Sequence, residues 1–254
     1  MGVHRVLFVD HHDPRAAAFF PESIPVINVL PHRLAVRYFK NKKLDRPVVV
    51  SPDNECGERA KAFWSRFKTG NCDVGMAAIV TDHSASVALD QCVSSDSSAS
   101  GDLKSEDPWC SDPSSRASEE NYDAQGAALV GEVRGRDVII VDDIVDSGHR
   151  VCRAARVCKA HGAKRVFAYA PHGVLRRSAF CAIEAAPLTE VLITNTLDLP
   201  LDADCVKIKT LNVSRLLALV LKRLHAEASA EGPREPLAEL YRFESRETRQ
   251  HAEQ

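Results

Sequence analysis

Short runs of branched apolar residues recur along this chain, and segments with helical periodicity follow most of them. Residues 138–141, Val-Ile-Ile-Val, form one such run, and a helical pattern over residues 150–163 comes next. Valine- and isoleucine-rich strands that alternate with helices are what a parallel sheet covered on both faces requires. The sequence therefore predicts an α/β fold. The predicted strands are residues 5–10, 47–53, 76–80, 137–146, 165–173 and 190–196, and the predicted helices are residues 58–68, 150–163, 177–186 and 214–228.

The composition narrows the class of protein. Of the 254 residues, 44% are hydrophobic, which is enough to bury a substantial core. The formal net charge of −2 supplies no positive field that would draw the chain to nucleic acid or to an anionic membrane. No apolar run reaches the roughly 20 residues of a membrane span, and the first residues lack a signal-peptide pattern. We expect no nucleic-acid or membrane partner and a cytoplasmic location, with an organelle as the alternative.

The eight cysteines form no CxxC pair and no metal-type spacing. Together with the absent signal pattern, this indicates reduced, structural thiols. Cys152 and Cys158 fall on a predicted helix, where cysteine behaves as a small hydrophobic residue.

The strand and helix pattern stops between about residues 82 and 125. Twelve serines lie from Ser84 to Ser118, mixed with acidic residues and proline. Such a segment cannot bury enough apolar surface to offset its ordering, so it is predicted to be a disordered insertion. Residues 229–254 are predicted to form a charged C-terminal tail.

Acidic residues stand where several predicted strands end. These residues are Asp10, Asp53, Asp142 and Asp143. The carboxyl ends of parallel strands meet at one edge of a sheet, and open α/β sheets bind their ligands at that edge. We therefore expect the binding site there.

The segment that begins with the Asp142–Asp143 pair is the most specific candidate site. Unpaired carboxylates are too costly to bury, so the chain is expected to turn outward at this pair. Asp146, Ser147 and Gly148 then precede a helix, whose N-terminal N–H groups, with the hydroxyl and the permissive glycine, suit an anion. The two upstream acids suit the vicinal hydroxyls of a sugar, so a sugar phosphate is the predicted ligand. The alternative is an ordinary helix N-cap beside solvated acids.

Several segments together resemble the ribose-phosphate pyrophosphokinase family, which makes phosphoribosyl pyrophosphate. VIIVDDIVDSG resembles that family's phosphoribosyl pyrophosphate loop, and ALVGEVRGRDVIIVDD, AHGAKRVFAYAPHGVL, TEVLITNT and VVVSPDNECGERA resemble its other motifs in the same order. The resemblance implies a type I phosphoribosyltransferase-like parallel sheet flanked by helices. It also implies transfer of the pyrophosphoryl group of ATP to ribose 5-phosphate with magnesium, a reaction that depends on positioning and charge neutralisation.

The resemblance assigns roles to individual residues. It places Asp142 and Asp143 on the pair that holds the ribose hydroxyls, and it places Asp146, Ser147 and Gly148 on the loop that cradles the 5-phosphate. That loop normally closes with Gly-Thr, whereas here His149 and Arg150 follow. An arginine could itself pair with phosphate, so Arg150 is a further candidate for binding ribose 5-phosphate.

The resemblance also implies a nucleotide loop and a metal site. Asp10 and His12 match an Asp-x-His of the family's nucleotide and metal loop, and Asp53 matches an aspartate that contacts magnesium together with that histidine. Oxygen and imidazole groups hold magnesium only when substrate phosphates and waters complete its shell. The alternative is a loop acid and a surface histidine.

The chain departs from the family pattern at the positions that carry positive charge. Residues 54–59, Asn-Glu-Cys-Gly-Glu-Arg, stand in place of a Gly-Gly turn and a basic pair, so that one basic position has become acidic. Thr81, Asp82 and His83 stand where a mobile loop with Lys and Arg is expected. Losing a positioned cation costs orders of magnitude in the rate of phosphoryl transfer.

The resemblance also suggests a division into domains. Residues 1–25 are predicted to be a remnant of the family's N-terminal domain, because the family's N-terminal half, which supplies much of the ATP pocket, is expected to be absent before Met1. Residues 26–228 are predicted to form the phosphoribosyltransferase-like domain.

Three functions remain open from the sequence. The favoured hypothesis is a catalytically weakened or non-catalytic homologue that binds ribose 5-phosphate and forms a homo-oligomer or a hetero-oligomer with synthetase subunits. The second is an active synthetase that uses ATP and magnesium, and the third, least favoured, is a phosphoribosyltransferase.

Overall fold

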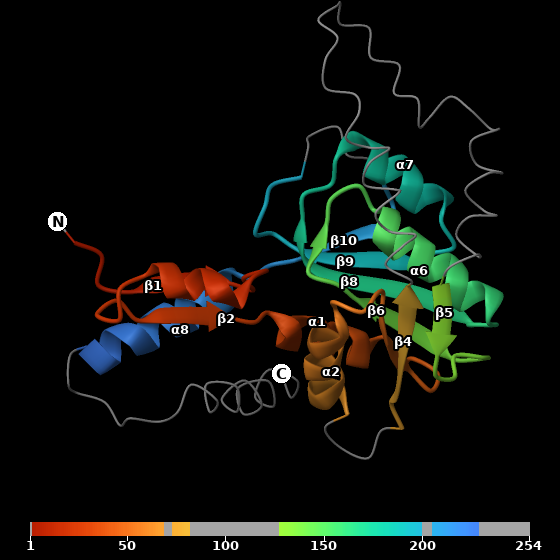
Figure 1. Cartoon of the computed structure of the whole chain (residues 1–254), viewed down its shortest axis with the longest axis horizontal. Helices are drawn as coiled ribbons and strands as arrows, with labels where there is room; N and C mark the ends of the chain where they lie inside the picture. The colour runs from red at the N-terminus through yellow and green to blue at the C-terminus, as the bar shows by residue number, and fades with distance from the viewer. Residues whose placement is uncertain (1, 69–72, 82–126, 200–204, 229–254) are drawn as a thin grey trace, which may run out of the picture. The chain divides into compact units, whose positions relative to one another are not determined.

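The computed structural model describes residues 2–68, 73–81, 127–199 and 205–228 (Figure 1). The chain divides into two compact units, Met1–Leu211 and Asn212–Gln254. The second unit contains the helix α8 (Ser214–Ala228), which confirms the helix predicted for those residues. The serine-rich segment of residues 82–125 and the tail of residues 229–254 lie outside the described residues. Among the residues that are described, no helix is long and apolar enough to cross a membrane.

The first unit is built on an extended sheet whose strands are mostly parallel. Its hydrogen-bonded order is β10-β9-β8-β6-β3-β4-β5, with β7 paired to β8. Among the strands that the structure describes in this sheet, only β5 runs antiparallel to its neighbour, β4. The strands are β3 (Val48–Ser51), β4 (Gly75–Thr81), β5 (Ala127–Val130), β6 (Asp137–Val141), β7 (Ile144–Val145), β8 (Arg165–Gly173), β9 (Glu190–Thr194) and β10 (Ile208–Leu211).

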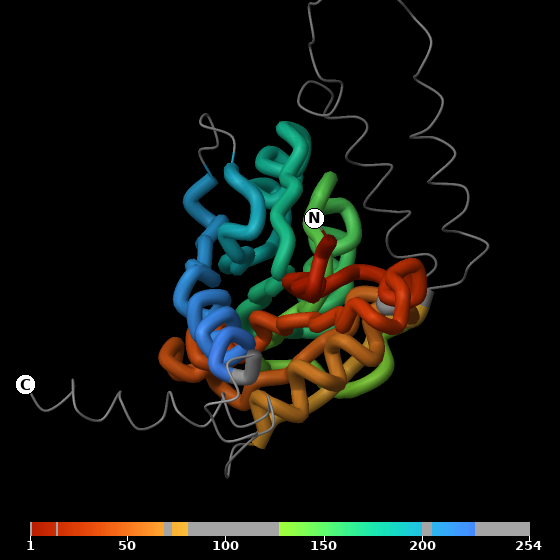
Figure 2. The backbone as a smooth tube through the Cα atoms, turned by 90° about the vertical axis from the view of Figure 1, so that its left-hand side faces the viewer, coloured from red at the N-terminus to blue at the C-terminus, as the bar shows by residue number. Residues whose placement is uncertain are grey.

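Helices cover both faces of this sheet. Side chains alternate between its faces along each strand, so that Val48 and Val50 pack with α6 (His149–Ala160) and α7 (Arg177–Ala185), while Val49 packs with α1 (His32–Asn41) and α2 (Gly57–Phe67). Figure 1 shows the two helix pairs on opposite sides of the strands, and the view turned by 90° shows the same separation (Figure 2). Because both faces are buried, the central strands are apolar throughout rather than alternating.

A second, smaller sheet precedes the main one. Strands β1 (Val6–Val9) and β2 (Val26–Val29) run parallel, and a 3-10 helix, η1 (Pro14–Phe19), lies between them in sequence. The pairing joins Val6 to Val26, so this sheet spans the domain boundary predicted at residue 25. The domain boundaries predicted at residues 25 and 228 stay predictions.

The order of the strands creates one switch point. From β3 the chain passes through α2 to β4 on one side, whereas from β6 it passes through α6 to β8 on the other side. Neighbouring strands whose connections leave in opposite directions open a gap at their carboxyl ends, and ligands of α/β proteins bind there. The loops after β3 and β6 are therefore the expected place for a site.

The predicted α/β class and the predicted parallel sheet flanked by helices are confirmed. Every predicted strand and helix has its counterpart, although the strand predicted over residues 137–146 is interrupted at Asp142 and Asp143 and becomes β6 and β7. Gly162 follows α6 with a φ of +84°, as the predicted helix ending requires. Among the described elements, the sequence reasoning missed the strands β2, β5 and β10, the helix α1 and the 3-10 helix η1.

Candidate functional site

Three carboxylates meet at the switch point between β3 and β6. Asp53 follows β3, and Asp142 and Asp143 follow β6; their exposed fractions are 9%, 1% and 4%. The expectation that the chain turns outward at Asp142 and Asp143 is therefore wrong, because both side chains are buried. They can be buried because they are paired, and the main partner is Arg150.

Arg150 lies near the start of α6, and its guanidinium contacts all three carboxylates. Its Nε donates to Oδ2 of Asp142 at 2.9 Å, and its Nη2 donates to Oδ1 of Asp142 at 2.6 Å and to Oδ1 of Asp143 at 2.9 Å. The remaining nitrogen, Nη1, donates to Oδ2 of Asp53 at 3.2 Å. The paired contact with Asp142 is the two-pronged geometry in which arginine binds carboxylates most strongly. Arg150 thus ties the loop after β3 to the loop after β6.

Backbone N–H groups bind the same carboxylates from their own loops. Oδ1 of Asp142 accepts from the N–H of Asp143 at 2.9 Å, and Oδ1 of Asp143 accepts from the N–H of Ile144 at 2.7 Å. Oδ1 of Asp53 accepts from the N–H groups of Glu55 and Cys56 at 2.9 and 2.8 Å, just before α2 begins. These local bonds fix the orientation of each carboxylate before any ligand binds.

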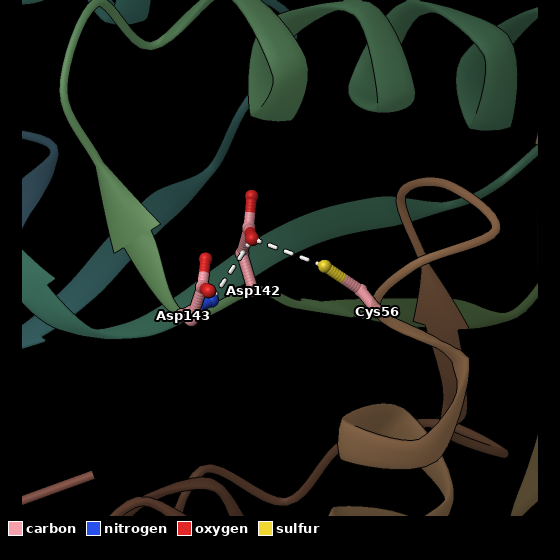
Figure 3. A group of neighbouring side chains, drawn as sticks. All are labelled: Cys56, Asp142 and Asp143. Carbon is pink, nitrogen blue, oxygen red and sulfur yellow. Dashed lines mark hydrogen bonds between the residues drawn. The ribbon is translucent and has the colours of Figure 1, made fainter. Parts of the chain in front are cut away.

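Cys56 completes the group, and sequence spacing gave no sign of it. Its Sγ donates to Oδ1 of Asp142 at 3.3 Å, and it reaches Asp142 from the loop after β3, across the switch point (Figure 3). Burial, reinforced by the negative charge of Asp142, raises the pKa of the Cys56 thiol far above its ordinary value. The thiol is therefore protonated at neutral pH and is a poor nucleophile.

The neighbouring acids Asp142 and Asp143 titrate differently. Burial raises the pKa of Asp142 to about 7 against the opposing charge of Arg150. Burial also disfavours the ionised form of Asp143, but hydrogen bonds from Asp142 and His12 and the charge of Arg150 outweigh it and lower that pKa to about 2. Like charges this close cannot both ionise freely, so the pair retains one proton to a higher pH than an isolated acid would.

Two predicted residues of the nucleotide loop lie at the edge of this cluster. Nδ1 of His12 contacts Oδ2 of Asp143, and the His12 side chain is itself 63% exposed. Asp10 is buried and pairs with Arg59 of α2. Asp10 also has a φ of +47°, a left-handed conformation that is costly for a residue with a side chain and is concentrated at functional sites.

The surroundings of Asp10 include two histidines that the sequence reasoning did not assign. Nε2 of His172 lies 3.0 Å from the carbonyl oxygen of Val9 and 3.1 Å from that of Asp10. Nδ1 of His32 lies 3.8 Å from Oδ2 of Asp10, and burial lowers the pKa of His32 to about 3. His32 is therefore neutral at physiological pH and fixes the loop by packing rather than by charge.

The predicted phosphate loop begins α6. Gly148 precedes the helix with a φ of +77°, as its assignment to a permissive position requires. Ser147 is exposed, and its Oγ accepts a long hydrogen bond, 3.4 Å, from the N–H of His149. Oδ2 of Asp146 pairs with Arg176 at 2.7 Å. Arg176 thus places a second guanidinium beside this loop, in addition to that of Arg150.

These residues do not fit a divalent metal ion in the arrangement they adopt. Ligand atoms of Cys56, Asp142 and Asp143 lie within 4.8 Å of one another, which is close enough to share an ion. However, the thiol is protonated, and Arg150 hydrogen-bonds to both oxygens of Asp142 and to one of Asp143. The predicted metal ligands His12 and Asp53 are joined to Asp143 and Arg150 respectively, rather than to each other. A guanidinium therefore provides the positive charge that these acids need.

The fold and the site together define the type I phosphoribosyltransferase-like class. A parallel sheet has paired acids at its switch point, and a loop with left-handed glycine begins the next helix. The solved structure of phosphoribosylpyrophosphate synthetase from Mycobacterium smegmatis shares this fold, with a TM-score of 0.66 and 23% identity over 89% of this chain and 60% of that chain.

Comparisons of sequence give the family. A family model described as phosphoribosyl synthetase-associated domain matches residues 38–232. The ribose-phosphate pyrophosphokinases of Vibrio parahaemolyticus and Shewanella oneidensis are 32% and 34% identical over 230 residues, which cover 90% of this chain and 60% of each relative. The chain belongs to the ribose-phosphate pyrophosphokinase family. It spans about 60% of the length of these curated relatives.

Proposed function

We propose that this chain is a family member that binds ribose 5-phosphate but turns it over weakly or not at all, and that it acts by assembling with synthetase subunits. The observation that carries the proposal is the contact of Arg150 with Asp53, Asp142 and Asp143. The guanidinium of Arg150 supplies the positive charge at these acids. Among the described residues of the cluster, it leaves no group of carboxylate oxygens that is suited to bind magnesium. A reaction that depends on magnesium and ATP should therefore be slow or absent at this site.

Binding of the sugar phosphate is supported by the groups that remain available. Carboxylate oxygens accept more than one hydrogen bond each, so Asp142 and Asp143 can receive ribose hydroxyls. The backbone N–H groups at the start of α6 and the guanidinium of Arg176 supply donors for the 5-phosphate. The acids and the start of α6 lie on one loop, as a ligand with hydroxyls and a phosphate at opposite ends would need.

Association with synthetase subunits rests on the description of the matching family model. That model is described as a synthetase-associated domain. We expect a tagged chain to co-purify with a longer synthetase homologue from its source cells, and recovery of the chain without any such homologue would count against this part of the proposal.

The binding test uses thermal unfolding with ribose 5-phosphate at millimolar concentration. A ligand that binds only the folded state raises the melting temperature by mass action. We expect a rise for the natural chain and none for Asp143→Ala, whereas Asp45→Ala, which changes an exposed acid at the opposite end of the sheet, should keep the rise. Absence of any rise in the natural chain would remove ribose 5-phosphate from the proposal.

A second function is favoured by the relatives themselves. Both named relatives are called ribose-phosphate pyrophosphokinases, and the matched lengths take in most of this chain. An active synthetase would have to move Arg150 from the acids before magnesium and ATP could act there. This alternative predicts AMP release from ATP and ribose 5-phosphate, whereas the favoured function predicts little or none.

A further inference from the structure

Arg150 occupies the position, among oxygen ligands, that a bound cation would take. Its three guanidinium nitrogens donate hydrogen bonds to acids on two different loops, and Asp142 alone receives two of those bonds. Carboxylate oxygens are the ligands that magnesium and manganese prefer. The three acids therefore offer the oxygen ligands of a divalent-cation site, but those oxygens are paired with the guanidinium of Arg150.

We propose that Arg150 is a resident counter-ion that excludes divalent cations from the Asp53, Asp142 and Asp143 cluster, so that removing its guanidinium creates a divalent-cation site. A divalent ion and a guanidinium cannot share these oxygens, because they compete for the same lone pairs and repel each other at short range. The inference deepens the proposed function and rests on it only for the identity of the site.

The geometry explains why the exclusion is stable. The carboxylates are held by backbone N–H groups of their own loops, so they cannot turn away from the guanidinium without losing those bonds. The guanidinium is held in turn by acids on both loops. An entering ion would have to break the contacts of Arg150 with all three acids, whereas an ion entering a chain without the guanidinium would meet prearranged oxygens.

The test measures binding of Mn²⁺ by the decrease in its free-ion electron paramagnetic resonance signal. We expect no saturable binding by the natural chain at millimolar Mn²⁺ and at least tenfold tighter binding by Arg150→Met. Adding Asp143→Asn to that variant should abolish the gained site. Saturable binding by the natural chain with the affinity of Arg150→Met would overturn the inference.

The matched control is Arg165→Met. Arg165 also pairs with a buried acid, Asp137, with its Nε 2.9 Å from Oδ1, but at the amino end of β6 and with one acid rather than three. Its removal should create no Mn²⁺ site. Equal Mn²⁺ binding by the two variants would show that any buried acid without its arginine suffices, which contradicts the proposal.

The Arg150→Met variant is expected to be less stable, so its folding is measured in the same samples by circular dichroism. If it is unfolded alone, the proposal predicts that Mn²⁺ restores a cooperative unfolding transition, because binding to the folded state adds to its stability. A variant that Mn²⁺ neither binds nor restores would overturn the inference. Ribose 5-phosphate is absent from these samples, so this test and the ribose 5-phosphate test fail independently.

Discussion

At each end of β6, buried acidic side chains pair with an arginine, but the number of acids per arginine differs between the two ends. At the amino end, Asp137 accepts two hydrogen bonds from Arg165 and one from the N–H of Asp45, and the pair is one acid to one arginine. At the carboxyl end, three acids share Arg150. The pKa values of the two acids shift in opposite directions. Burial favours a higher pKa for Asp137, but the hydrogen bonds from Arg165 outweigh it and lower that pKa. For Asp142, burial is the larger effect and raises the pKa.

The difference separates an ion pair that serves the fold from a cluster that serves a ligand. A one-to-one pair satisfies itself, so nothing further needs to bind. Three acids around one guanidinium keep negative charge that hydroxyl donors of a ligand can use. We therefore interpret the excess of acids at the carboxyl end of β6 as the mark of a binding site. Substitutions at the two ends of β6 should change stability and its pH dependence differently.

The largest expected effect is on stability. Breaking a buried ion pair by removing one partner typically costs about 3–5 kcal/mol, because the other charge stays buried. We expect Arg150→Met to lower the free energy of unfolding at pH 7 by an amount near the top of that range and Arg165→Met by less, as measured by urea denaturation. Arg15→Met, whose side chain is 89% exposed, is the surface control. A smaller loss for Arg150→Met than for Arg165→Met would break the comparison.

The next effect is a difference in pH dependence between Asp142→Asn and Asp137→Asn. Because the folded-state pKa of Asp142 is raised to about 7, the natural chain loses stability from this group as pH rises from about 4 to 7. Asparagine removes that loss. The free energy of unfolding of Asp142→Asn should therefore rise, relative to that of the natural chain, as pH increases over this interval. A difference of one pKa unit between the folded and unfolded states corresponds to roughly 1.4 kcal/mol, which sets the scale of the gain.

Asp137 should show the opposite sign. Its folded-state pKa lies below the ordinary value of 3.8, so its contribution is fully present above that pH and is lost as pH falls. Asp137→Asn should therefore be destabilising by a constant amount from pH 5 to 8, in unfolding curves measured across that range. A cost of Asp142→Asn that grows with pH would contradict the assignment of the raised pKa to that end.

A smaller effect is expected from backbone conformation at the start of α6. Gly148 has a φ of +77°, while an added Cβ would meet Cγ1 of Ile183 at an ordinary distance of 3.5 Å. Gly148→Ala should therefore cost about 1–2 kcal/mol from strain alone, and it should weaken ribose 5-phosphate binding. Gly57→Ala is the matched control at the start of α2, where no atom lies within 4 Å and φ is not positive. We expect that variant to be neutral or slightly stabilising.

The smallest perturbation is chemical labelling of native thiols. Burial raises the pKa of Cys56, while Cys181 is exposed. Iodoacetamide at pH 8, followed by peptide mass spectrometry, should label Cys181 at least tenfold faster than Cys56. Rapid labelling of Cys56 would mean that the loop after β3 opens readily and that the cluster is not held closed.

Much of the fold could be predicted because its central strands are uniformly apolar and end at acids. The missed elements have weaker signals. Strands β2 and β10 have only four residues each, and β5 is short and follows the serine-rich segment. Helix α1 carried a readable signal, since its buried positions His32, Ala35, Val36 and Phe39 follow helical spacing, but basic residues interrupt it.

The sequence predicted which acids would lie together at this edge of the sheet, but not their pairings. Strand ends identified Asp53, Asp142 and Asp143, because the carboxyl ends of parallel strands meet at one edge. Arg150 was expected to pair with phosphate, and its contacts with the acids depend on the fold bringing α6 over two loops. Cys56 was missed for the same reason, since its contact with Asp142 joins residues 86 positions apart.

The most direct test of the central claim is AMP release from ATP, magnesium and ribose 5-phosphate by the purified chain. We predict little or no release by the natural chain above that of Asp143→Ala prepared in the same way, although ribose 5-phosphate raises the melting temperature of the natural chain. Robust AMP release by the natural chain that is lost in Asp143→Ala would contradict the claim. It would show that Arg150 moves away from the acids and allows magnesium to bind there.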